Sequence, residues 1–545
     1  MRVLAFGKDH EEKEEMHVKG KLSLFLAMTV GLGLLGGCAP STPAGDEKTA
    51  DAKEPITLDW YVNYSWFTTG WGENLVSKTI TEETGVSVNF ITPMGNETNK
   101  LNTLIDSDSL PDIVTIGWWE PQLQEMVSGG MVYPLNVLAD EYDPTFYDVT
   151  DETVRDWYTL SDGNIYGYPN STLTAEDLEK YDNIASNVTF LVRKDIYEAI
   201  GSPDMSTPEG FHDAIVAAKE MFPEVDGKPM IPIGAHEFNE DGCVSFDQYL
   251  QHFLAVPFEK DGRKIDRNTD PEYLRWLKMF RKLCQEGYIS DDVFVDQRTQ
   301  TSEKIAEGRY FCMLYQRTDM ADQEKILYEK DPEKIYIAVD GPRNSNGDDP
   351  VLPVNGISGW TLTLISKNCK DPERAIQFID YLMSEHGQKL VYLGVEGVTY
   401  DMVDGVPVLK PEIRDLLNRD REAYDAKYGA DFTYWMLQSL TSQAQWKPES
   451  VEPMKQLEEW TYPYVAYTGQ YDSSIQEDSN LGRIYSNCRE LWGAYLPQLL
   501  LADSDEEFDE LVDAYVTERD NMGWEILMDE MTRQMNQNKE RLHIE

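Results

Sequence analysis

Short stretches of apolar or alternating residues are interleaved along this chain with stretches of helical period. Residues 56–64, 86–92 and 112–116 have the pattern of β-strands. Thr207-Pro208 and Asp371-Pro372 each place a capping side chain before a proline that occupies the first helical position. Because strand and helix signals alternate, the sequence predicts an α/β fold.

The C-terminal third of the chain has a mostly helical pattern with acidic faces. From Ser504 onward the periodicity predicts one or two amphipathic helices. The chain has 545 residues, which is too long for one ordinary domain, so we expect two or more compact units. Internal repeats and low-complexity blocks are absent from the sequence.

The N-terminal region has the three parts of a secretory signal peptide. After Met16 come a short basic stretch, an apolar run over residues 22–35 and small residues that end at Cys38. The apolar run is too short to span a bilayer stably. Residues 1–15 are rich in acidic side chains, which is unusual at the start of a signal peptide, so Met16 is an alternative to Met1 as the first residue.

Residues 35–38, Leu-Gly-Gly-Cys, resemble the lipobox of bacterial lipoproteins. In that family the cysteine thiol is acylated, with chains such as palmitate, and the peptide is cut before it. The resemblance implies a signal peptide over residues 1–37 and a lipid-anchored flexible tether over residues 38–54. We therefore expect the protein on the extracytoplasmic face of a Gram-positive cell membrane, held by Cys38. The alternative is a plain secretory signal with a cysteine there by chance.

Charge excludes two classes of partner. The chain has 48 basic and 98 acidic residues, a net charge of −50, whereas 41% of its residues are hydrophobic and 11% aromatic. Such a chain buries real cores but repels nucleic acid and anionic lipid surfaces. No CxxC pair occurs, which argues against structural zinc, and we expect most of the remaining cysteines to be buried. These are Cys243, Cys284, Cys312, Cys369 and Cys488.

Several motifs, in their order and spacing, resemble those of the extracellular solute-binding proteins of bacterial ABC importers. The similarity is to a family 1-like, Gram-positive lipoprotein branch that takes up carbohydrates. The matching segments are a helix, turn and Pro-Asp strand over residues 101–113, a Gly-x-Leu-x-Pro-Leu-like turn over 129–135, a crossing segment over 162–169, a strand and capped helix from 191 to 208, and later motifs at 284–289 and 307–308. Asp108 stands where glycine is usual in the family.

This resemblance implies a two-lobed, periplasmic-binding-protein-like (type II) α/β fold with a hinge and a helix-rich C-terminal region. Lobe 1 would contain residues 55–170 and 345–415, and lobe 2 would contain residues 171–344 and 416–545. The protein would be a monomer that holds a sugar, expected to be a neutral oligosaccharide, between its lobes. It would deliver that ligand to the permease subunits of an ABC transporter without a cofactor.

Sugar sites combine aromatic rings, which pack on the C–H face, with polar side chains that bind the hydroxyls. Residues just past strand ends are the expected positions. The candidate ligand-binding residues in lobe 1 are Asn63, Tyr64, Trp66, Trp71, Trp118, Trp119, Glu120 and Trp360, and those expected from lobe 2 are Glu237, Tyr315, Arg317, Trp435 and Trp446. Large rings are often simply packed in cores, which is the alternative for each aromatic residue.

Other functions and a metal site have weaker support. A secreted carbohydrate-active hydrolase is the rival class, but Trp360 stands where a nucleophile elbow at Ser358 needs glycine. A sugar-sensing or adhesion lipoprotein would use the same fold. Residues 266–270 begin like a calcium loop, but Pro271 replaces the turn glycine and Leu277 the bidentate glutamate. We therefore predict no bound metal.

Overall fold

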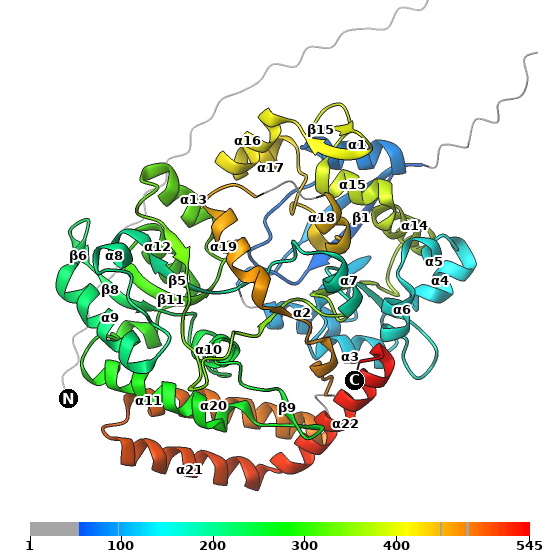
Figure 1. Cartoon of the computed structure of the whole chain (residues 1–545). Helices are drawn as coiled ribbons and strands as arrows, with labels where there is room; N and C mark the ends of the chain where they lie inside the picture. The colour runs from blue at the N-terminus through cyan, green and yellow to red at the C-terminus, as the bar shows by residue number, and fades with distance from the viewer. Residues whose placement is uncertain (1–53, 96, 447–449, 476–478, 545) are drawn as a thin grey trace, which may run out of the picture. The chain divides into compact units, whose positions relative to one another are not determined.

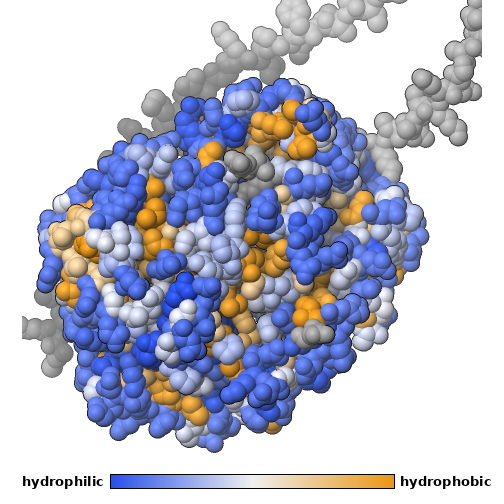
Figure 2. All heavy atoms as spheres, viewed as in Figure 1, coloured by the Kyte–Doolittle hydropathy of each residue, from blue (hydrophilic) through white to orange (hydrophobic). Residues whose placement is uncertain are grey.

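The computed structural model describes residues 54–95, 97–446, 450–475 and 479–544, which belong to one compact unit. The predicted signal peptide, the tether up to residue 53 and Cys38 lie outside these described residues. Within the described part of the chain, no helix is long and apolar enough to cross a membrane. The face seen in Figure 2 is mostly hydrophilic, with separate hydrophobic areas, as the excess of acidic residues predicts.

The first sheet has the strand order β2-β1-β3-β14-β4. Strand β1 is parallel to β2 and β3, whereas β14 is antiparallel to β3 and β4. Every residue of β3 and β14 is buried, as expected for central strands that are covered on both faces. The strand bounds are β1 (Ile56–Val62), β2 (Val86–Ile91), β3 (Ile113–Gly117), β4 (Gly167–Pro169) and β14 (Thr361–Ile365). The three predicted strands are confirmed.

Helices from two separated parts of the sequence pack on the first sheet. Asp371 caps α14 as predicted, because its carboxylate accepts a hydrogen bond from Arg374 N at 3.1 Å. The helices are α1 (Leu75–Thr84), α2 (Glu97–Asp106), α3 (Gln122–Ser128), α4 (Leu135–Tyr142), α5 (Phe146–Val149), α6 (Glu152–Tyr158), α14 (Pro372–Met383) and α15 (Glu385–Leu393). Figure 1 shows α14 near α4 and α5, although these helices are far apart in the sequence.

The second sheet has the strand order β12-β5-β11-β8. Strands β11 and β8 are parallel, so both end at the same edge, and β5 is antiparallel to β11 and starts there. The strands are β5 (Val188–Arg193), β8 (Ile231–Gly234), β11 (Tyr310–Gln316) and β12 (Tyr336–Ala338). The surrounding helices include α8 (Lys194–Ala199), α9 (Pro208–Met221), η1 (Ser245–Tyr249), α10 (Leu250–Phe253), α11 (Pro271–Gln285), α12 (Arg298–Ala306), α13 (Ala321–Lys330) and α19 (Met454–Thr461).

Smaller elements connect and decorate the two sheets. A short parallel pair, β13 with β17, joins two of the connecting segments. The bounds are α7 (Ala175–Lys180), β6 (Glu224–Val225), β7 (Lys228–Pro229), β9 (Glu259–Lys260), β10 (Arg263–Lys264), η2 (Arg267–Thr269), η3 (Asp291–Phe294), β13 (Leu352–Pro353), β15 (Tyr400–Val403), β16 (Val406–Leu409), η5 (Tyr462–Tyr464), β17 (Val465–Ala466) and η6 (Gly469–Tyr471).

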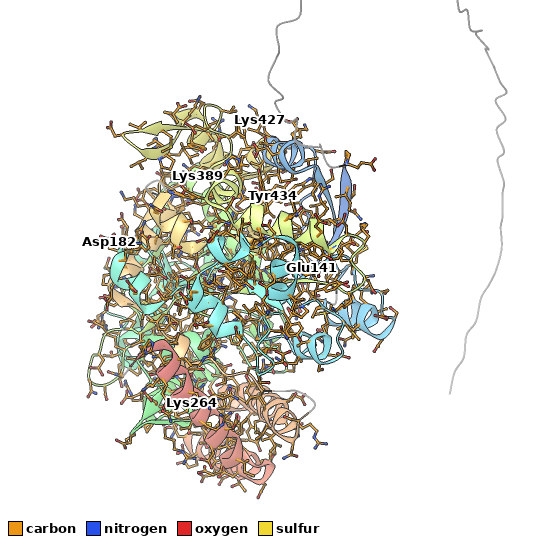
Figure 3. The ribbon with its side chains drawn as sticks, turned by 90° about the vertical axis from the view of Figure 1, so that its right-hand side faces the viewer. Glu141, Asp182, Lys264, Lys389, Lys427 and Tyr434 are labelled. Carbon is orange, nitrogen blue, oxygen red and sulfur yellow. The ribbon has the colours of Figure 1, made fainter. Side chains whose placement is uncertain are left out.

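Three long helices end the chain: α20 (Asn480–Leu501), α21 (Asp505–Met522) and α22 (Trp524–Leu542). Helix α20 packs on α11 of the second sheet's core, and α22 packs along β10 and η6. Lys264, labelled in Figure 3, lies against α22, since its backbone N donates to Thr532 Oγ1 at 3.2 Å. At the other end of α22, Arg541 donates to the carbonyls of Asp156 and Trp157 in α6, both at 2.8 Å. Helix α22 therefore contacts α6, which lies beside the first sheet, as well as the β9–β10 hairpin and η6.

Residues 416–446 pack differently from the predicted division into lobes. They form α17 (Arg421–Lys427), η4 (Trp435–Leu437) and α18 (Leu440–Trp446), after α16 (Pro411–Arg419). Tyr424, Trp435 and Trp446 belong to the same buried core as Leu58 of β1, and not to the core of the second sheet. Their assignment to lobe 2 is therefore corrected here; the remaining lobe boundaries stay a prediction.

Two further predictions concern single residues and short segments. Cys243, Cys312, Cys369 and Cys488 are buried, Cys284 is half-buried, and all five are free thiols in the described structure. The segment 162–169, expected as a crossing between lobes, ends in the edge strand β4 (Gly167–Pro169), and the chain leaves the first sheet after that strand.

Candidate functional site

The carboxyl ends of β1 and β3 place several candidate side chains at one edge of the first sheet. Because these strands are parallel, Asn63 and Trp118, which follow them, lie at the same edge. Strand β14 is antiparallel to β3 and pairs Thr361 with Gly117, so Trp360 also comes to this edge. Trp118 N donates to the carbonyl of Trp360 at 3.3 Å. The three segments therefore converge at this edge in the structure.

Four aromatic side chains, Tyr64, Trp66, Trp360 and Trp435, form one cluster at this edge. The ring centroids of Trp360 and Trp435 are 4.5 Å apart, and those of Trp66 and Trp435 are 5.5 Å apart. Tyr64 packs against Trp360 at 5.3 Å and against Trp435 edge-on at 5.5 Å. These spacings are those of direct aromatic contact.

The aromatic cluster is buried at its base and open at its top. Trp435 is only 4% exposed, whereas Trp66 is 49% exposed and Trp360 is half-buried. The indole Nε1 of Trp435 is buried and has no hydrogen-bond partner among the described residues. An exposed indole face fixed on a rigid aromatic base is the surface on which a sugar ring packs.

Asn63 and Glu120 form a hydrogen-bonded pair beside the cluster. Asn63 Nδ2 donates to Glu120 Oε2 at 2.5 Å, and Tyr61 donates to Asn63 Oδ1 at 2.7 Å. Gly117 N donates to Glu120 Oε1 at 2.7 Å. Burial raises the pKa of Glu120 to about 7, although the hydrogen bonds from Gly117 and Asn63 act in the opposite direction. These contacts hold both carboxyl oxygens of Glu120 in fixed positions.

A second carboxylate, Glu97 of α2, lies near this pair. Its Oε1 accepts hydrogen bonds from Ser65 N at 2.7 Å and from Ser65 Oγ at 3.0 Å, which ties α2 to the loop after β1. The charge of Glu97 adds to the rise in the pKa of Glu120. This edge of the first sheet therefore carries acceptors and negative charge.

Side chains of the second sheet gather at the edge where β8 and β11 end. His236 follows β8 and stacks on Tyr315 of β11, with centroids 4.0 Å apart and planes 15° apart. Asp319 lies 3.8 Å from His236 Nε2 and accepts from Arg298 at 3.1 Å. Arg317 is buried: its Nε donates to Ser186 O at 2.8 Å and its Nη1 pairs with Glu458 at 3.1 Å.

The segments that connect the two sheets leave from these same two edges. At the first sheet, Asn170 N donates to Thr361 O at 3.0 Å, just after β4 ends. At the second sheet, Arg317 N donates to Asn187 O at 3.0 Å, just before β5 begins. The edge that carries the aromatic cluster and the edge that carries His236 are thus the ends between which the chain crosses.

Ser245, His236 and Asp319 are arranged in the order of a hydrolase triad, but the hydroxyl is not placed as a nucleophile. Ser245 is 2% exposed, and its Oγ donates to Leu314 O at 2.7 Å. A nucleophilic serine must be reachable by substrate and donate its proton to the histidine. The hydroxyl of Ser245 does neither, so Ser245 is not a nucleophile here and its hydroxyl orients the ring of His236.

Four further candidate residues also lie outside the aromatic cluster. Trp71 packs on Phe90 and Tyr434, and its Nε1 donates to Thr81 Oγ1 at 2.9 Å, which is a core position. Trp446 is 8% exposed and lies under Lys389. Trp119 is exposed and meets Trp118 edge-on, with its ring over Gly117. Glu237 is half-buried beside His236.

Sequence reasoning missed His236, Asp319 and Glu97. His236 precedes Glu237 just after the end of the buried strand β8, and this position at a strand end could have made His236 a candidate as well. Asp319 and Glu97 are two among 98 acidic residues, and nothing in their local sequence separates them from surface charges.

The loop that begins like a calcium site is closed by protein contacts. Asp266 caps η2, since its Oδ1 accepts from Asn268 N at 3.0 Å, and its Oδ2 pairs with Arg519 of α21. Across the described residues, no group of three or more His, Cys, Asp or Glu side chains is placed to hold a metal ion. An arginine thus occupies the side of Asp266 to which a cation would bind.

The family model of bacterial extracellular solute-binding proteins matches residues 76–408, more than half of the chain. Lipoprotein LipO of Bacillus subtilis (strain 168) is 22% identical over 325 residues, which cover 58% of this chain and 61% of LipO. The polygalacturonan/rhamnogalacturonan-binding protein YtcQ of the same strain is 21% identical over 390 residues, which cover 70% of this chain and 74% of YtcQ.

A solved structure shares the fold over nearly the whole described chain. It is the ABC-transporter substrate-binding protein FusA of Streptococcus pneumoniae in complex with kestose, with a TM-score of 0.68 at 17% identity, covering 89% of this chain and 99% of that one. The predicted periplasmic-binding-protein-like α/β fold is confirmed. The family, YtcQ and FusA are all named as binding proteins. From the family match over residues 76–408, we conclude that the chain belongs to the bacterial extracellular solute-binding proteins.

Proposed function

We propose that the protein captures an oligosaccharide between its two sheet edges and delivers it to the permease of an ABC importer. The observation that carries the proposal is the aromatic cluster: the exposed indole of Trp66 and the half-buried indole of Trp360 lie on the buried base of Trp435. Beside them is the carboxylate of Glu120, which the buried Asn63 helps to hold in place. Rings that pack on C–H faces beside acceptors for hydroxyls are what sugar recognition requires.

The charges of this edge favour a neutral sugar. Glu97 and Glu120 are the acidic groups next to the cluster, and each is held in place by protein hydrogen bonds. A uronate carboxylate at this edge would meet negative charge at short range in addition to the long-range repulsion of a protein with a net charge of −50. YtcQ is named for acidic polysaccharides and FusA was solved with neutral kestose; by charge, this edge suits ligands of the second kind.

The location follows from the proposed lipid anchor. Cys38 would be acylated, residues 38–54 would form the tether, and the folded unit would act as a monomer on the outer face of the cell membrane. The family is extracellular and one similar protein is named a lipoprotein, which supports this placement. A binding protein of this kind has no catalytic step, and the buried Ser245 hydroxyl agrees with that assignment.

The proposed lobes differ from the sequence prediction in where the second segment of lobe 1 begins and where it ends. Lobe 1 would contain the first sheet together with residues 361–446, because η4 and α18 share its core. Lobe 2 would contain the second sheet and the C-terminal helices, and the connecting segments with β13 and β17 would form the hinge.

A thermal-shift screen tests the function. The mature protein is mixed with kestose, nystose, maltotetraose and tri-galacturonate, and its unfolding temperature is measured at low and at moderate salt. A ligand at about 100 times its dissociation constant adds about 2.7 kcal/mol of stability. We expect a shift with a neutral oligosaccharide and no breakdown of that sugar. A shift only with the uronate would overturn the charge argument, and sugar cleavage would overturn the assignment as a binding protein.

A further inference from the structure

His236 and Asp319 are adjacent polar side chains at the edge of the second sheet. Each has one acceptor atom, His236 Nε2 and Asp319 Oδ2, that accepts no hydrogen bond from the described residues. His236 follows β8, and Asp319 follows β11. Because β8 and β11 are parallel, both residues lie at the edge from which the connecting segments leave. The connecting segments run from this edge to the edge of the first sheet that carries the aromatic cluster.

The tautomer of His236 is set by Ser245. A serine hydroxyl has a single hydrogen, and Ser245 Oγ donates it to Leu314 O at 2.7 Å. The same Oγ accepts from His236 N at 2.9 Å and lies 3.0 Å from His236 Nδ1. Since Ser245 has no second hydrogen to give, Nδ1 must carry the proton and donate it. In the neutral ring, Nε2 is therefore an acceptor.

The position of His236 Nε2 is also fixed. One face of the ring stacks on Tyr315 at 4.0 Å, and Tyr249 meets the ring edge-on at 5.4 Å. Tyr315 is itself 1% exposed, so it supports His236 from below and does not offer its own ring to a ligand. Because the imidazole is already held by stacking and by its hydrogen bond, its Nε2 points in one direction, and ligand binding does not have to order this side chain.

Asp319 supplies a second acceptor beside Nε2. Its Oδ1 accepts from Arg298 at 3.1 Å, which orients the carboxylate, and its Oδ2 lies 3.8 Å from His236 Nε2. Two acceptors at this distance do not bond each other. Within the described structure, no protein donor is hydrogen-bonded to Asp319 Oδ2 or His236 Nε2.

We propose that His236 Nε2 and Asp319 Oδ2 accept hydrogen bonds from two neighbouring hydroxyls of the bound sugar. This inference rests on the proposed function and assigns a ligand-contacting residue that the sequence did not indicate. Neighbouring hydroxyls on a pyranose or furanose ring are two donors a short distance apart, which matches two adjacent acceptors. A site built to accept from a hydroxyl discriminates strongly against an analogue that lacks it, because its buried polar groups are then left unpaired.

The test measures affinity by isothermal titration calorimetry with kestose, nystose and maltotetraose on the wild-type mature protein. The tightest binder of the three is then titrated into His236→Gln and Asp319→Asn, which keep side-chain volume and change one acceptor each. His212→Gln is the matched control, since His212 also lies beside a carboxylate, at 2.6 Å from Glu286, on α9. We expect each acceptor variant to lose about 10- to 100-fold in affinity and the control to change by less than twofold.

A ligand-side comparison separates contact from a structural effect. Single-deoxy derivatives of the same sugar are titrated into the wild type and both variants. One deoxy derivative should bind the wild type about 10- to 100-fold more weakly than the parent sugar does. The same derivative and the parent sugar should bind His236→Gln with equal affinity, because the missing hydroxyl and the missing acceptor belong to the same hydrogen bond. If His236→Gln lowers the unfolding temperature, the same comparison of affinities is made with Asp319→Asn, which changes a half-buried position.

The outcomes distinguish the two proposals. If the wild type binds a sugar and both variants bind it equally well, this inference is wrong and the proposed function stands. If every deoxy derivative is weakened equally in wild type and variants, the histidine is structural and the inference is also wrong. If the wild type binds none of the three sugars, the proposed function fails as stated, and the inference fails with it.

Discussion

The indole rings of Trp66 and Trp360 lie parallel, with their planes 2° apart and their centroids 6.1 Å apart. Trp66 comes from the loop after β1 and Trp360 from the residue before β14, so only the sheet brings them together. Trp435 contacts both rings from its buried position. The parallel pair is therefore held by the core and needs little reordering to receive a ligand.

Trp66→Ala should weaken ligand binding without unfolding the protein. Since Trp66 is 49% exposed, its loss removes ligand contact but little core packing. We expect a loss of about 10- to 100-fold in affinity by calorimetry, and a change in unfolding free energy of less than about 1 kcal/mol. Trp66→Phe keeps an aromatic face and should retain most of the affinity. Full affinity in Trp66→Ala would remove this ring from the site.

Trp435→Ala, in contrast to Trp66→Ala, should strongly lower the stability of the protein. Trp435 is 4% exposed at the base of the cluster, so truncation leaves a cavity in the core. We expect a loss of about 3–5 kcal/mol in the free energy of unfolding, measured by chemical denaturation. A cost below about 1 kcal/mol would contradict the packing of η4 on the first sheet.

Glu120→Gln should change how stability depends on pH. Burial raises the pKa of Glu120 to about 7 from its ordinary value of 4.5, so the folded state holds the proton more tightly than the unfolded state does. The stability that this proton contributes is present below pH 4.5 and is lost as the pH rises through about 7. Glutamine stays neutral and escapes this loss.

We therefore expect Glu120→Gln to gain about 1 kcal/mol over wild type between pH 4.5 and pH 8, measured by urea unfolding. The side chain is partly exposed, so solvent screens part of the full effect. Glu97→Gln, which changes a neighbouring charge, is the control. Parallel pH profiles for wild type and Glu120→Gln would contradict the raised pKa.

Asp380 is a second carboxyl whose charge should destabilise the fold. It is 3% exposed in α14, and neither oxygen has a hydrogen-bond partner among the described residues. Burial, with a contribution from Asp143, raises its pKa to about 8. Stability from the bound proton is present below the ordinary pKa of 3.8 and is lost as the pH rises through about 8.

Asp380→Asn should accordingly stabilise the protein at pH 8 by roughly 1–3 kcal/mol and have little effect at pH 4. Thermal unfolding at the two pH values gives the measurement. Asp143→Asn should give a smaller gain in the same direction. Equal effects of Asp380→Asn at both pH values would show that the carboxyl is not protonated in the fold.

Removal of divalent cations should leave stability unchanged. Asp266 is paired with Arg519 and with the backbone of its own turn, so no site for a cation remains on it. We expect the unfolding temperature to be the same within about 1 °C with a chelator and with added calcium. A fall of several degrees in the chelator would refute the predicted absence of a structural metal.

Cys38→Ser should release the protein from membranes. If the thiol carries the lipid, wild type expressed in a Gram-positive host is found in the membrane fraction and the variant in the medium. Cys488→Ser changes a cysteine of the folded unit and should leave the wild-type distribution unchanged. Equal release of wild type and Cys38→Ser would favour a plain secretory signal.

Much of the first sheet could be predicted because its signals are local. The strands that end before Asn63 and Trp118 are apolar runs, and parallel pairing brings their ends together. The placement of Trp435 could not be predicted in the same way. Helical periodicity indicates which face of a segment is buried, but not which of two sheets covers it. The chain stays in the core of the first sheet beyond residue 415, and no local signal marks that continuation.

The second-sheet edge shows the other limit. Tyr315 was predicted as a ligand contact from its residue type and its place at a strand end, but it is buried under His236. Whether an aromatic ring or its neighbour faces outward depends on packing between β8 and β11, which are separated by many residues. Arg317 is likewise committed to Glu458, a partner from a distant helix.

The contacts of α22 with α6 and with the segment around η6 bear on how the protein would close on its ligand. Arg541 holds the carbonyls of Asp156 and Trp157, whereas Asn538, one turn earlier, donates to Asp472 O at 2.8 Å beside η6. A rotation of one sheet relative to the other must pivot close to this helix or detach its last turn from α6. The C-terminal helix thus limits which rotation axes are open to the molecule.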